Sequence, residues 1–348
     1  MKKLIVWILI VGISFAIALP NALKAAENAR LRHDGDGWET VLPETAGMRA
    51  DMLEQAGKWL GRTNVTSFIV IKNGRIVWEQ YYRGEILSDY AYTYSVANLL
   101  LSSITGISID NGALNPDDRL IDYYPEYFNS EKEAVSSEIG QITLRSVLSG
   151  ASGLCDPNED YFHQTDWLRW MLEQKPEEDT EETSTAVAPL TAYLVSGAIT
   201  RSTGKQAAEL VNEYICAEAG MKSVIWHTGP EGYNIGGGYA YMRPIDVARL
   251  GQLYLDVGTY HGRQIIPESW ARETLYNSYG LTKTKINKYD VYLSQGDGTV
   301  PNLCLVPEQG LVIVLTAYPG LFKASLTERH VEILLSEYLL DETWGEKV

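Results

Sequence analysis

The segment Tyr94–Gly112 reads Tyr-Ser-Val-Ala-Asn-Leu-Leu-Leu-Ser-Ser-Ile-Thr-Gly-Ile-Ser-Ile-Asp-Asn-Gly, and most of what the sequence predicts depends on it. Bulky apolar residues are mixed with small ones, and no charged residue occurs before Asp110. This pattern predicts one buried helix. We expect Ser95 to cap its start and Asn111-Gly112 to end it, because Asn and Gly both tolerate a left-handed backbone.

This segment resembles the nucleophile helix of the serine β-lactamase and penicillin-binding-protein superfamily. It is most similar to the β-lactamase-related esterases and amide hydrolases typified by 6-aminohexanoate-dimer hydrolase. In that family the helix begins Ser-x-x-Lys: the serine attacks a carbonyl, and the lysine one turn later takes its proton. Here Ser95 occupies the nucleophile position, whereas Asn98 occupies the lysine position. The resemblance therefore implies a catalytic site that lacks its base.

Further segments match the same family in order along the chain. The first three are a Pro-Glu-x-x-Gly-Met turn (43–48), a helix (51–60) and a hairpin around Asn73-Gly74 (67–81). The others are an Asp-Asp loop (114–125), an Ile-Thr-Leu-Arg helix (142–154) and a glycine turn followed by a helix (236–255). Two β-rich runs around Asn-Gly are a strong hairpin signal. Thr143 is expected to cap a short helix that Gly153 ends, and Pro244 suits a first helical turn.

The second catalytic motif of the family, Tyr-x-Asn, is absent at its expected position. Residues 194–204 match the helix that follows it without a gap, which places Val187 at the tyrosine position. A slip of one residue would place Ala188 there, so that neither alignment supplies a tyrosine. Tyr193 lies six residues away and is expected to point elsewhere.

For the third motif, the sequence offers Gly296, Asp297 and Gly298, between strand-like runs at 289–293 and 302–306. Glycines there would let a ligand approach the backbone, although a plain hairpin turn explains them equally well. With Tyr94, these three residues are the predicted substrate-binding residues. The triplet His227-Thr228-Gly229 resembles this motif, but it precedes the glycine turn, and we interpret it as a coincidence.

The order of elements predicts an α/β (α+β) fold of the β-lactamase/transpeptidase-like type. Strands lie at both ends of the chain and helices fill the middle. We expect an antiparallel sheet built from both chain ends, about 37–85 and 285–345, packed with the terminal helices. A helical insertion at about 90–280 should complete a single domain spanning 27–348.

Residues 1–26 are typical of a secretory signal. Lys2 and Lys3 precede an apolar run, Leu4–Leu19, and then a stretch of small residues. This predicts a periplasmic or extracellular protein, with an uncleaved membrane anchor as the alternative. The formal net charge of −16 would repel nucleic acid and anionic lipid, so neither is an expected partner.

Cys155, Cys216 and Cys304 have no metal-binding spacing, and we expect neither a metal nor a cofactor. Two of these cysteines could pair in an exported chain, but the sequence does not say which, and buried free thiols are equally consistent with it.

Three functions remain open. The first is an impaired homologue that binds a small-molecule or peptide-like ligand with little or no turnover. The second is an active hydrolase of an ester, amide or β-lactam that has recruited another base: Asp297, Lys283, Lys285 or Lys288. The third is a non-catalytic exported domain that binds a partner. The sequence specifies neither the substrate nor the oligomeric state.

Overall fold

The computed structural model describes residues 37–127, 139–154, 163–173, 189–294, 302–318 and 327–340. Its centre is a seven-stranded sheet whose strands come from both ends of the chain. The strand order is β1-β3-β2-β12-β11-β10-β9. The strands span Glu39–Thr40 (β1), Val65–Lys72 (β2), Arg75–Tyr81 (β3), Thr282–Ile286 (β9), Tyr289–Leu293 (β10), Leu303–Val306 (β11) and Leu311–Ala317 (β12).

The pairing of β2 with β12 joins the two ends of the chain, as the sequence predicts. Lys72 lies opposite Leu311, and the pair continues to Ser67 opposite Thr316. The predicted hairpin of β2 and β3 also forms, with Asn73 and Gly74 at φ values of 49° and 73°. All pairs are antiparallel except β1 with β3, which is parallel and which the sequence did not indicate.

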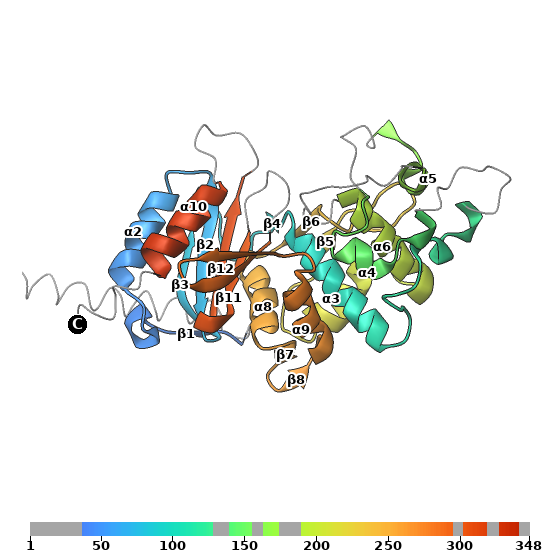
Figure 1. Cartoon of the computed structure of the whole chain (residues 1–348). Coiled ribbons are helices and arrows are strands. Elements are labelled where there is room, and N and C mark those ends of the chain that lie inside the picture. The colour runs from blue at the N-terminus through green and yellow to red at the C-terminus, as the bar shows by residue number, and fades with distance from the viewer. Residues whose placement is uncertain are drawn as a thin grey trace, which may run out of the picture.

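Helices cover both faces of this sheet (Figure 1). On one face, Phe68 and Val70 pack with the terminal helices α2 (Ala50–Leu60), α10 (Glu328–Ile333) and the π-helix η8 (Leu334–Leu339). On the other face, Ile69 and Ile71 pack with the helical insertion. Because side chains alternate along a strand, β2 serves both cores at once.

Helix α8 (Pro244–Leu255) belongs to the insertion and packs on β12, β11 and β2. Pro244 stands in its first turn, as expected. Arg243, the residue before the helix, donates two hydrogen bonds to the carboxylate of Asp246, at 2.6 and 2.7 Å. Their side chains are only 8% and 4% exposed, so this ion pair is buried at the junction of the sheet and the insertion.

The rest of the insertion is mainly helical, as predicted. Its longer helices are α3 (Val96–Asp110), α6 (Pro189–Thr203) and α9 (Glu268–Asn277), with shorter ones at α4 (Leu144–Leu148), α5 (Trp167–Leu172), α7 (Ala207–Leu210) and the π-helix η6 (Val211–Cys216). Single 3₁₀ turns occur at η1 (Pro43–Ala46), η2 (Leu120–Tyr123), η3 (Pro125–Tyr127), η4 (Ile139–Gln141) and η7 (Pro307–Gln309). Short strands form two small sheets: β4 (Ala91–Tyr92), β6 (Ala240–Met242) and β5 (Ile225–Trp226), and β7 (Thr259–Tyr260) with β8 (Arg263–Gln264).

One local prediction is confirmed and two need correction. As predicted, α3 ends at Asn111-Gly112: Asn111 is the C-cap, with a right-handed φ of −78°, and Gly112 is left-handed, with a φ of 72°. Ser95 occupies the N-cap position of α3, but its side chain makes no capping hydrogen bond. Thr143 does cap α4, in a capping box with Ser146, but α4 ends at Leu148 and the left-handed Gly150 follows it, well before Gly153.

The predicted leader, residues 1–26, lies outside the described residues, as does Cys155. None of the helices in the described part of the chain combines the length and the apolar character needed to cross a bilayer. Cys216 and Cys304 are buried free thiols. Burial raises the pKa of Cys216 to about 12 and also raises that of Cys304.

Candidate functional site

The start of α3 is fixed by backbone hydrogen bonds on both sides of Ser95. The N–H groups of Val96, Ala97 and Asn98 each bond to the carbonyl three residues earlier, at 3.0–3.2 Å. One residue further back, Thr93 donates from both its N–H and its hydroxyl to the carbonyl of Ala240, at 3.0 and 2.9 Å. The helix start is thereby attached to β6, and Ser95 lies 5% exposed at this junction.

Asn98 lies three residues after Ser95, which places both on one face of α3. Asn98 is 3% exposed and packs against Gly280. A Cβ at Gly280 would come within 2.7 Å of the Asn98 carbonyl carbon and 3.0 Å of its Cβ. Gly280 also has a left-handed φ of 73°, so that only glycine fits here without strain. The backbone at Gly280 therefore packs directly against the backbone of α3 at Asn98, and we call this the Gly280 contact.

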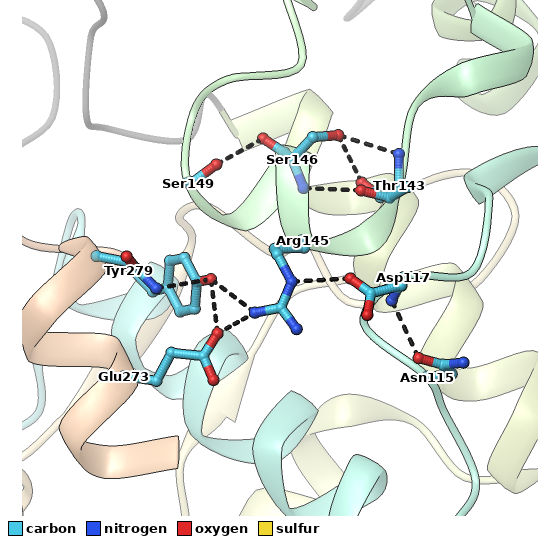
Figure 2. A network of polar contacts seen from close by, with 9 residues as sticks. Asn115, Asp117, Thr143, Arg145, Ser146, Ser149, Glu273 and Tyr279 are labelled. Carbon is cyan, nitrogen blue, oxygen red and sulfur yellow. Dashed lines mark hydrogen bonds and ion pairs between the residues drawn. The ribbon is translucent and has the colours of Figure 1, made fainter. Parts of the chain in front are cut away.

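A polar network around Arg145 fixes the chain next to the Gly280 contact (Figure 2). Arg145 Nε donates to Asp117 at 2.9 Å, and Nη1 donates to Glu273 and, at 3.3 Å, to the hydroxyl of Tyr279. The Tyr279 hydroxyl in turn donates to Glu273 at 3.0 Å. Arg145 therefore joins the Asp-Asp loop, α4 and α9 to the residue preceding Gly280. Two of the segments that match the family in sequence meet in this network.

The second predicted motif falls mostly outside the described residues. Val187 lies there, and the described chain resumes at Pro189, the first residue of α6. Tyr193 does point elsewhere: its hydroxyl donates to Glu231 at 2.7 Å, and its ring packs on Trp167. The absence of a family-like tyrosine therefore stays a prediction from the sequence.

Gly296, Asp297 and Gly298 also lie outside the described residues. The strands on either side of them form as predicted and pair antiparallel, with Tyr292 opposite Leu305. His227-Thr228-Gly229 follows β5, which belongs to the separate three-stranded sheet. The interpretation that this triplet is not the third motif stays a prediction from the sequence.

Four tyrosine rings and one histidine gather where β4 leads into α3. Tyr92 lies opposite Tyr241 across the β4–β6 pair, and its ring centroid is 4.2 Å from that of Tyr94 and 5.4 Å from that of Tyr241. Its ring is also 6.0 Å from that of Tyr239, and the His227 ring is 5.4 Å from that of Tyr241. We call these residues the aromatic cluster: Tyr92, Tyr94, Tyr239, Tyr241 and His227.

Of the aromatic cluster, only Tyr94 is among the predicted substrate-binding residues. The segment that carries Tyr239 and Tyr241 matches the family in sequence, but no local pattern indicates that their rings join those of Tyr92 and Tyr94. Burial raises the pKa of Tyr92 to about 12 and also raises that of Tyr94. Both phenols are therefore protonated at neutral pH.

Within the described ranges, no group of three or more His, Cys, Asp or Glu side chains is placed to hold a metal ion. The Beta-lactamase family model matches residues 51–317, which is most of the chain. The chain belongs to the Beta-lactamase family. The match confirms the family predicted from the Ser95 helix and its companion motifs.

Among curated Beta-lactamase-family relatives, the chain is 22% identical over 260 residues to the 6-aminohexanoate-dimer hydrolase of Paenarthrobacter ureafaciens. That match covers 69% of this chain but only 62% of the relative's length. Among solved structures, it resembles a Bacillus anthracis protein assigned as a 6-aminohexanoate-dimer hydrolase, with a TM-score of 0.61, 18% identity and coverage of 84% of this chain and 82% of that one. A penicillin-binding protein homologue from Caulobacter crescentus has a TM-score of 0.60 at 13% identity, covering 84% of this chain and 97% of that one. These structural likenesses confirm the β-lactamase/transpeptidase-like fold.

The lysines considered as replacement bases for this Beta-lactamase-family site have other partners. Lys283 and Lys285, on β9, each contact the carboxylate of Asp290, at 2.9 and 3.0 Å. The hydrogen bond to Asp290 raises the pKa of Lys283, which keeps its amine charged at neutral pH. Lys288 Nζ lies 5.4 Å from the centre of the Tyr289 ring. A charged ammonium cannot accept the proton of a serine.

Proposed function

We propose that this protein is an exported, catalytically impaired serine hydrolase homologue that retains a binding site for an ester, amide or β-lactam carbonyl at Ser95. The observation that carries the proposal is the start of α3. Ser95 and Asn98 are buried on one helix face where the family has serine and lysine. A serine hydroxyl is a weak nucleophile without a neighbouring base, and the amide of Asn98 is not basic.

The loss of the second proton carrier supports the same conclusion. Val187 occupies the position of the family's tyrosine. The members of such a catalytic unit act together, so removing them typically lowers the rate by several orders of magnitude. Among the candidate replacement bases, Lys283 is held as an ammonium by Asp290.

Binding needs less than catalysis does. The backbone at the start of a helix carries partial positive charge and favours a carbonyl oxygen or an anion. In this proposal the backbone N–H of Ser95 is one donor of such an oxyanion-type site. The ligand class follows from the family, whose curated relative is a hydrolase of the 6-aminohexanoate dimer. The negative net charge of the chain makes nucleic acid an unsuitable ligand.

Export is part of this proposal and rests on residues 1–26 alone. Their charged start, apolar run and small-residue stretch have the composition of a secretory signal. N-terminal sequencing of the protein recovered from a periplasmic or culture fraction would test it. A chain that still begins at Met1 in the membrane fraction would favour the uncleaved anchor instead.

The decisive experiment measures the initial rate of p-nitrophenyl acetate hydrolysis by the wild type, Ser95→Ala and Ser223→Ala. Ser223 is exposed and serves as the matched serine control. We expect all three rates to agree within experimental error, and we expect no turnover of a chromogenic cephalosporin. A wild-type rate clearly above that of Ser95→Ala, with Ser223→Ala unchanged, would make Ser95 a live nucleophile and refute the impairment.

A fluorophosphonate probe distinguishes the alternatives. Labelling of the wild type but not of Ser95→Ala would support the active hydrolase with a recruited base. The absence of labelling, together with the absence of binding of any ester or amide ligand, would leave the non-catalytic partner-binding domain. The proposed function predicts weak labelling or none, but measurable ligand binding.

A further inference from the structure

The aromatic cluster is assembled from separate segments of the chain that hydrogen bonds hold together. Its members come from three places in the chain: β4 and the turn after it, the glycine turn leading into β6, and the loop after β5. Two hydrogen bonds, one between backbone groups and one from backbone to side chain, join these pieces to one another. The N–H of His227 donates to the carbonyl of Tyr239 at 3.1 Å, and the N–H of Tyr239 donates to the hydroxyl of Tyr92 at 3.4 Å.

Two members of the cluster have a strained backbone. Tyr94 has a φ of 44° and Tyr239 a φ of 57°, both in the left-handed region. That conformation costs a non-glycine residue on the order of 1–2 kcal/mol, and bulky side chains rarely adopt it. Strain of this kind persists where the surrounding structure enforces it, and it concentrates at functional sites. Glycine would remove the strain at either position, so the presence of tyrosine indicates a use for its ring.

The position of the cluster indicates that use. Tyr94 immediately precedes Ser95, and Thr93 attaches this turn to β6 through Ala240. The four tyrosines are half-buried and His227 is exposed, so the rings form a surface with an open edge. The cluster therefore begins at the residue next to Ser95, beside the site proposed for the carbonyl.

We propose that the aromatic cluster is a binding surface for an aryl group next to the carbonyl bound at Ser95, so that aryl-substituted amides and esters are the preferred ligand class. This inference rests on the proposed function, because it assumes that the carbonyl lies at Ser95. Aromatic rings attract one another in offset or edge-to-face arrangements beyond the burial of their area. His227 is exposed with its ring 5.4 Å from that of Tyr241, so solvent reaches the cluster on this side.

Phenylacetamide and acetamide differ by one phenyl ring and test the binding surface without any reaction. Their binding to the full chain is measured by ligand-observed saturation-transfer NMR titration. We expect phenylacetamide to bind at least about tenfold more tightly than acetamide. Tyr241→Leu should remove most of this preference, whereas Tyr241→Phe, which keeps the ring, should retain it. Tyr276→Leu is the matched control, because Tyr276 is 87% exposed and outside the cluster.

Equal binding of the two amides would overturn the proposal, as would an unchanged preference in a folded Tyr241→Leu. If Tyr241→Leu fails to fold by circular dichroism, His227→Ala changes only the exposed rim and should weaken phenylacetamide binding by a few fold. An unchanged affinity there would count against the binding surface. Ser95→Ala should still bind phenylacetamide, so failure of the binding surface is distinguishable from failure of the proposed function, which the ester rates decide.

Discussion

Gly280→Ala should destabilise the protein through a direct collision with the backbone of α3. Gly280 combines a left-handed φ of 73° with close contact to Asn98 and Leu99. An added Cβ would lie 2.7 Å from the Asn98 carbonyl carbon and 2.8 Å from the Leu99 nitrogen. Both atoms belong to the backbone of α3, so that no side-chain rotation can relieve the collision.

The magnitude has two parts. The left-handed conformation costs alanine on the order of 1–2 kcal/mol, partly offset by about 0.4–1 kcal/mol of lost entropy in the unfolded chain. Forcing a methyl group into a packed site typically costs a further 1–3 kcal/mol. The expected loss in the free energy of unfolding is therefore about 2–4 kcal/mol, a large share of the 5–15 kcal/mol that is typical of a folded domain.

Gly112→Ala separates the two parts. Gly112 follows the same helix with a nearly equal φ of 72°, but no atom lies within 4 Å of the place that an added Cβ would occupy. Urea unfolding followed by tryptophan fluorescence gives the free energy of unfolding of each variant. We expect Gly112→Ala to lose about 1 kcal/mol and Gly280→Ala at least about 1 kcal/mol more. Equal losses in the two variants would refute the collision and with it the Gly280 contact.

Three further predictions use urea unfolding, p-nitrophenyl acetate hydrolysis and thiol labelling. Asn98→Lys alone should not raise the ester rate, because the tyrosine partner is missing, and the buried ammonium should lower stability; an appreciable rate would show that lysine alone suffices. Asp246→Asn should lower the free energy of unfolding by about 3–5 kcal/mol, because it removes the negative charge from a buried ion pair. Glu268→Gln, in an exposed pair, should lower it by less than about 1 kcal/mol, and similar losses in the two variants would contradict this prediction. In a Cys155→Ser variant, Cys216 and Cys304 should not react with Ellman's reagent at pH 8 until urea unfolds the chain. Both thiols are buried, and Cys216, with a pKa of about 12, stays protonated at that pH. Rapid reaction of the folded protein would show that the thiols are accessible.

The sequence alone determined the frame of this protein. Asn73-Gly74 between two β-rich runs predicted the hairpin, and the charge-free run after Ser95 predicted the buried helix, because these structures depend on neighbouring residues. The pairing of β2 with β12, more than 200 residues apart, came from the family resemblance and not from periodicity. The replacement of the family's lysine by Asn98 is likewise evident from the sequence.

Only the tertiary structure decided what surrounds Ser95. Tyr94 and Tyr241 lie almost 150 residues apart in the chain, and no local pattern indicates that their rings belong to one cluster. Nothing in the local sequence distinguishes Gly280 from other glycines, and only its contact with Asn98 explains why glycine is required there. Local spacing predicts which face of an element a side chain occupies, but not what the opposing element presents to that face. That depends on how the sheet, the insertion and their connecting turns pack together, which is settled by contacts between distant residues.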